Sequence, residues 1–145
     1  TEYVNRVTVP GAAWKGVDLL YDSDAISMGE RVYRQQKCAS CHGDEGRGSA
    51  GMDLVDQAGD PSWATDLQSD PLHGGTESLD IARRIYLGMP GSAMPSSRNL
   101  SEAELAALVA YCKSLSAEPK RYLTNHQRRE RAIGRIQAEK RRKSP

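Results

Sequence analysis

The most constraining feature of the chain is the run CASCH at positions 38–42, which holds two of the three cysteines. Three cysteines are too few for a disulfide framework, although a single structural disulfide within the run is one interpretation. A thioredoxin-like redox pair would lie among alternating strands and helices, and the sequence shows no such alternation. Half of a zinc site would need a second ligand pair, but Cys112, His73 and His126 stand singly and far apart.

Two thiols three positions apart, followed directly by a histidine, form the pattern of a c-type haem attachment. At this spacing Cys38 and Cys41 can reach the two vinyl groups along one haem edge and form thioethers. The next residue then lies beneath the iron, so His42 is the expected proximal ligand, its other ring nitrogen oriented by a backbone carbonyl. The sequence therefore predicts one covalently bound haem c.

A sixth iron ligand is expected in the segment 85–95, which holds Met89 and Met94. Methionine as a residue type fills a core more often than it binds a metal. The Pro and Gly residues around these two stop the preceding helix and stiffen an extended loop. Such a loop can hold a thioether against a metal at low entropic cost, and the residues alone leave both methionines open as the ligand.

Together these motifs resemble the small bacterial class I c-type cytochromes, in which CxxCH on an N-terminal helix is followed by a Gly-x-Pro-Gly-x-x-Met-Pro loop. The resemblance covers roughly residues 27–116. It implies that Met94 is the distal ligand and that Met89 occupies a variable position. Met52, His73 and His126 are less favoured, because nothing around them resembles a ligand loop.

The same resemblance extends to residues 63–67. It implies that Leu67 lies against the haem face and that Trp63 lies near a propionate, although Trp63 could equally be ordinary core. The resemblance also implies that Gly29 lets the last helix cross the first one closely, and that Tyr111 packs on that first helix.

Three helices are expected in the haem domain. The first runs from about residue 25 to 36 with Asp22, Ser23 or Asp24 as its cap, and the second from Ser78, as its cap, to about residue 87. The third follows a capping box of Ser101 and Glu104 and carries apolar residues at helical spacing.

Two side-chain expectations accompany these helices. Arg83 and Arg84 are expected to face water. Cys112 is expected to be an inert buried thiol, with a second thioether, a regulatory thiol or an intermolecular disulfide as alternatives.

Charge divides the chain into two parts. Residues 1–119 contain 10 Lys and Arg against 17 Asp and Glu, a net −7, whereas residues 120–145 contain 10 against 2, a net +8. Such asymmetry concerns partners rather than fold. The basic segment could meet a partner protein, anionic lipid or the acidic body of the same molecule, whereas nucleic acid is not expected because the segment lacks aromatic residues beyond Tyr122.

The sequence thus predicts an all-α cytochrome c fold of about three to five helices around one covalent haem. An extended arm is expected at 1–24, the haem domain at 25–119 and a basic tail, helical from about Thr124 or Asn125, at 120–145. The chain has no Phe and only two Trp, so the haem is expected to fill part of the core. No apolar run is long enough to span a bilayer, although the chain could lie near a membrane surface.

The expected function is single-electron transfer between redox proteins outside the cytoplasm, in the bacterial periplasm, rather than enzymatic catalysis. We expect a subunit docked through its basic tail in a larger redox complex. A freely diffusing shuttle is the first alternative, and a haem enzyme or gas sensor with an open sixth position is the second. The first residue, Thr1, is what a processed mature chain would show.

Overall fold

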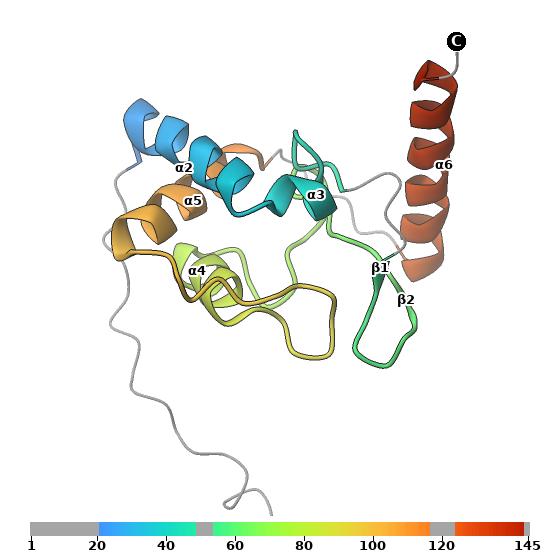
Figure 1. Cartoon of the computed structure of the whole chain (residues 1–145), viewed down its shortest axis with the longest axis horizontal. Helices are drawn as coiled ribbons and strands as arrows, with labels where there is room; N and C mark the ends of the chain where they lie inside the picture. Colours follow the sequence, from blue (N-terminus) through green and yellow to red (C-terminus); the bar gives the residue numbers. More distant parts are fainter. Residues whose placement is uncertain (1–20, 49–53, 117–123, 144–145) are drawn as a thin grey trace, which may run out of the picture.

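The computed structural model describes residues 21–48, 54–116 and 124–143 of the chain. These residues form five helices and one small antiparallel sheet (Figure 1). The helices are α2 (Ser23–Gln35), α3 (Cys38–His42), α4 (Ser78–Leu87), α5 (Glu102–Ser114) and α6 (Asn125–Lys143), and the strands are β1 (Leu54–Val55) and β2 (Pro61–Ser62). The expected mostly α-helical fold is confirmed. Of the N-terminal arm expected at 1–24, residues 1–20 lie outside the described residues.

The two long helices of the body begin at the caps that the sequence indicates. Asp22 caps α2, where its Oδ1 accepts a hydrogen bond from the Ala25 backbone N–H at 2.7 Å. Ser101 and Glu104 form the predicted capping box of α5, in which each side chain accepts from the other residue's backbone N–H. Both caps satisfy backbone N–H groups that have no partner inside the helix.

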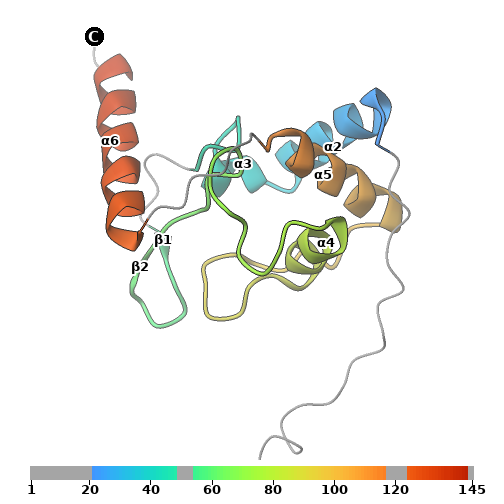
Figure 2. The ribbon, with the colours of Figure 1, turned by 180° about the vertical axis from the view of Figure 1, so that it is seen from behind.

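α2 and α5 cross at close range and form the centre of the body, as the two opposite views show (Figures 1 and 2). The crossing depends on Gly29, because a Cβ built there would lie 2.0 Å from the carbonyl oxygen of Ala107. Beside it, the rings of Tyr33 and Tyr111 meet edge to face with their centroids 5.2 Å apart. The implied close crossing at Gly29 and the packing of Tyr111 are therefore confirmed.

We expect Gly29→Ala to destabilise the folded holoprotein by about 1–3 kcal/mol, because the added methyl group must push the α5 backbone away. Chemical denaturation followed by helical circular dichroism measures the loss. Gly134→Ala in α6 is the matched control, since nothing lies within 4 Å of a Cβ built there. An unchanged free energy of unfolding for Gly29→Ala would contradict the close crossing.

α4 differs from expectation at its N-cap and at Arg84. Its N-cap is Glu77 rather than Ser78, and the Glu77 side chain makes no capping bond. Ser78 is instead the first helical residue, and its hydroxyl accepts a hydrogen bond from Lys113 Nζ at 3.1 Å, so this tertiary contact overrides its capping tendency.

Arg84 of α4 is half-buried rather than facing water, and its guanidinium donates a hydrogen bond to the carbonyl of Gly75. This burial lowers the pKa of Arg84. Arg83 is exposed as expected.

The apolar core lies between α2, α4 and α5 and includes Cys112. The Cys112 thiol is buried, and burial raises its pKa to about 12, with a smaller contribution from Cys38. A thiol with so high a pKa stays protonated near neutral pH and is a poor nucleophile. The expected inert buried thiol is what the structure shows.

α6 stands to one side of this body, with its first turns near β2 and the loop that follows it (Figures 1 and 2). Thr124 and Gln127 form a reciprocal cap at its start, in which each side chain accepts from the other residue's backbone N–H. The connection from α5, residues 117–123, lies outside the described residues. Among the described helices, none is long and apolar enough to cross a membrane.

Candidate haem site

The two thiols and the histidine of the CASCH run lie on one short helix. The chain leaves α2 at Gln35 and turns at Lys37, whose φ of 59° is the left-handed conformation, before α3 begins at Cys38. Tyr33, buried on α2, donates a hydrogen bond from its hydroxyl to the carbonyl of Gly43 at 2.7 Å. The end of α3 is thereby fixed to the helical body.

The imidazole of His42 is held by a backbone carbonyl. Its Nδ1 lies 3.0 Å from the carbonyl oxygen of Thr65, and because that oxygen can only accept, Nδ1 carries the proton. Burial lowers the pKa of His42, while the bond to Thr65 acts in the opposite direction. The ring is therefore neutral near pH 7, and Nε2 keeps the lone pair that a metal ligand requires.

A cavity of about 800 Å³ opens beside this histidine, within the range of roughly 300–1,000 Å³ typical of cofactor sites. It brings together all the residues expected to attach or ligate the group, both candidate methionines included. These are Cys38, Cys41, His42, Met89 and Met94. The cavity wall is mostly apolar, as a large planar macrocycle needs.

The methionine segment forms a tight loop that lines the same cavity as α3. The backbone N–H of Met89 donates to the carbonyl of Met94 at 3.1 Å, and Ser92 bonds to both residues. At the loop's base, Gly88 has φ 72°, and a Cβ there would lie 2.7 Å from the backbone nitrogen of Ser96. Both methionines are half-buried, and Met94 also packs against the apolar core.

Comparison with known proteins agrees with this geometry. The family model described as Cytochrome c matches residues 26–116, about three fifths of the chain. The chain belongs to the cytochrome c family. Its cofactor is therefore a covalently bound haem c.

Two relatives show the kinds of assembly in which similar domains occur. Over 119 residues, 81% of its length, this cytochrome is 34% identical to the Cbb3-type cytochrome c oxidase subunit CcoP of Rubrivivax gelatinosus. The chain spans about a third of the length of that relative. A chain of the Kuenenia stuttgartiensis reducing HAO-like protein complex is 29% identical with a TM-score of 0.69, over 78% of this chain and 54% of that one.

Haem c fits the residues around the cavity. Two cysteines three positions apart, a neutral imidazole with its Nδ1 already bonded and a methionine loop all line one mostly apolar cavity. Within the part of the chain that the structure describes, no group of three or more His, Cys, Asp and Glu residues could hold a metal ion by itself. His42 and a methionine would hold the iron, and the two thiols the porphyrin edge.

The remaining predicted site residues lie in different surroundings. Trp63 lines the cavity and is 41% exposed, and its position near a propionate stays a prediction. Leu67 packs against the apolar core and is not among the described residues that line the cavity. His73 also lines the cavity, His126 is exposed on α6, and Met52 falls outside the described residues.

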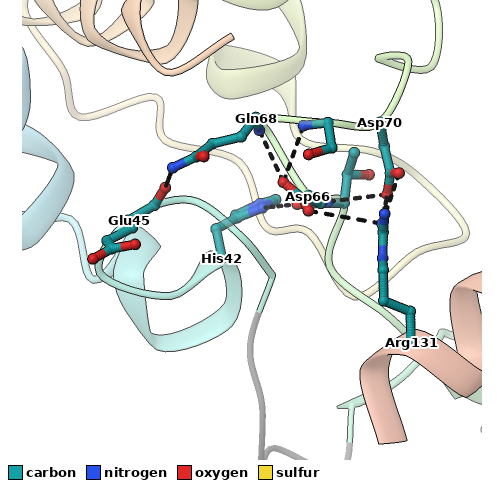
Figure 3. A network of polar contacts seen from close by, with 8 residues as sticks. His42, Glu45, Asp66, Gln68, Asp70 and Arg131 are labelled. Carbon is teal, nitrogen blue, oxygen red and sulfur yellow. Dashed lines mark hydrogen bonds and ion pairs between the residues drawn. The ribbon is translucent and has the colours of Figure 1, made fainter. Parts of the chain in front are cut away.

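A buried acidic pair that the sequence does not predict lies beside the cavity. Asp66 and Asp70 are 1% and 4% exposed at their side chains, and both line the cavity (Figure 3). Arg131 of α6 meets them, with its Nη2 2.6 Å from Asp70 and 3.8 Å from Asp66. The sequence signal is weak, since an Asp before a short turn is common and its partner is 61 residues away.

Proposed function

We propose that this chain transfers single electrons through its haem c, with Cys38 and Cys41 as the thioether residues and His42 and Met94 as the axial ligands. The observation that supports the proposal is the single cavity in which both thiols, the Nδ1-bonded imidazole and the methionine loop meet. Met94 is preferred to Met89 because it precedes the second proline of the loop and packs against the core.

The residues of this chain would make the site suited to electron transfer. The haem iron supplies a centre that changes oxidation state by one electron. The carbonyl of Thr65 fixes the tautomer and the direction of the His42 ring. The hydrogen-bonded Met89–Met94 loop would hold the Met94 thioether in place, so little conformational entropy would be lost when it binds the iron. With His42 and Met94 both bound to it, the iron would have no free position for a substrate, and His/Met ligation would raise the reduction potential.

We further propose that the chain works as a subunit of a larger extracytoplasmic redox complex. Two relatives support this, one being a subunit of a cbb3-type oxidase and the other part of an HAO-like complex. Because haem c is attached outside the cytoplasm, the proposed location is the bacterial periplasm. The basic tail is the proposed partner contact, since exposed arginines give α6 a cationic surface.

The test of the proposed function is a redox titration of the purified holoprotein with visible spectra, followed by exposure of the ferrous form to carbon monoxide. We expect a reversible one-electron transition and no change on adding the gas, because tight Met ligation excludes it. Rapid formation of a carbon monoxide adduct would contradict the proposal and favour a haem enzyme or gas sensor.

A further inference from the structure

The starting observation is that two buried carboxylates share one cation supplied by the tail helix. Arg131 Nη2 donates to both Asp70 oxygens, at 2.7 and 2.6 Å, and lies 3.8 Å from Asp66. The Asp66 and Asp70 side chains are almost fully buried, and Arg131 is 19% exposed. A buried carboxylate is costly unless it is paired, so removal of the arginine would leave negative charge uncompensated.

The second observation is that a single peptide group joins this ion pair to His42. The backbone N–H of Asp66 donates to Asp70 Oδ2 at 3.3 Å, while the carbonyl of the same peptide group, on Thr65, accepts from His42 Nδ1 at 3.0 Å. The contacts therefore run without interruption from Arg131 on α6 through Asp70 and the 65–66 peptide to the imidazole (Figure 3).

The local structure holds this peptide rigidly. Asp66 Oδ1 accepts from the backbone N–H groups of Gln68 and Ser69 at 3.0 and 3.1 Å, and the Asp70 N–H returns to the Asp66 carbonyl at 2.9 Å. The turn 66–70 thus has little freedom to move the Thr65 carbonyl away from His42. A change of charge at Asp70 therefore acts on a fixed hydrogen bond rather than on a loose loop.

We propose that Arg131 is a positioning residue through which the tail helix tunes the reduction potential of the haem. The inference rests on His42 being the axial ligand, as in the proposed function. An uncompensated Asp70 carboxylate polarises the 65–66 peptide and strengthens its pull on the Nδ1 proton, which makes the imidazole a stronger donor and stabilises ferric iron. Arg131 offsets that charge and so holds the potential up.

The test measures the reduction potential of full-length holoprotein variants at low ionic strength. We expect Arg131→Gln to shift the reduction equilibrium about threefold toward the ferric form, roughly 28 mV for one electron, and Asp70→Asn to shift it in the opposite direction. The double variant should return close to the wild-type potential. Arg131→Lys, which restores the charge but not the forked geometry, should recover part of the shift.

A second readout separates the hydrogen-bonded path from a general effect of charge. In the diamagnetic ferrous form, the proton resonance of His42 Nδ1–H should move downfield in Arg131→Gln and upfield in Asp70→Asn, as its bond to Thr65 strengthens or weakens. Arg129→Gln removes the same charge from an exposed position on the same helix and should move neither the resonance nor the potential appreciably.

Two results would overturn the inference. One is an equal potential shift in Arg131→Gln and Arg129→Gln, and the other is an Asp70→Asn variant whose potential does not rise. A retained low-spin spectrum in each variant shows that the axial ligands are intact, so failure of the inference is distinguishable from failure of the ligand assignment.

Discussion

Met94→Ala is expected to abolish the low-spin His/Met spectrum and to lower the reduction potential of the holoprotein. The thioether would be lost from the iron, and water or a weaker group would take its position. Because the choice of axial ligands spans roughly 0.8 V across haem proteins, we expect a fall on the order of 0.1 V. Absorption spectra that extend to the near-infrared Met-to-iron band measure the loss of the His/Met signature. A redox titration measures the fall in reduction potential.

Met89→Ala is the matched control, since Met89 lines the same cavity and lies in the same hydrogen-bonded loop. It should leave the spectrum almost unchanged and cost only packing, on the order of 1–2 kcal/mol for a half-buried methionine. Loss of the Met signature in Met89→Ala, with its retention in Met94→Ala, would reverse the ligand assignment.

The parts of the site that could be predicted from sequence are those encoded locally. Thiol spacing and the adjacent His42 depend only on a run of five residues, and the capping box of Ser101 and Glu104 spans four. The methionine loop is similarly set by its own Pro and Gly residues. These features occur in the structure as predicted because they do not depend on residues that are distant in the sequence.

Features that depend on distant partners could not be predicted. Ser78 has good capping chemistry, yet Lys113 from another helix takes its hydroxyl. Arg84 is expected from the sequence to face water, and nothing in the sequence singles out Arg131 from the other basic residues of the tail. The fold gives each an oxygen partner outside its own helix. The sequence contains the opposite charges of tail and body, but it does not indicate which arginine meets which carboxylate, since Arg131 and Asp70 lie 61 positions apart.

α6 also carries three exposed arginines, Arg129, Arg141 and Arg142, distributed around the helix. Arg131 points into the body, so the charges that anchor the tail and those left for a partner belong to different residues. This division allows partner binding to be tested without deleting the tail, and without disturbing the contacts that lead to His42.

Replacement of Arg129, Arg141 and Arg142 together by Gln is expected to weaken binding to the subunits that co-purify with the wild-type chain. Exposed ion pairs contribute about 0.5 kcal/mol each, so three of them change affinity by on the order of tenfold. The loss should be seen at 0.1 M salt and nearly vanish at 1 M, where the Debye length falls from about 10 Å to about 3 Å. The visible spectrum and the reduction potential should stay at their wild-type values.

A triple Gln variant of Arg31, Arg83 and Arg98 is the matched control, because it removes the same charge from exposed positions on the body. None of these three residues lines the cavity. Binding measured across a salt series should separate the two variants, since only the α6 variant loses affinity and salt dependence together. Equal weakening in both would mean that overall charge, rather than the tail, governs association, and a freely diffusing electron carrier would then explain the chain better than a docked subunit.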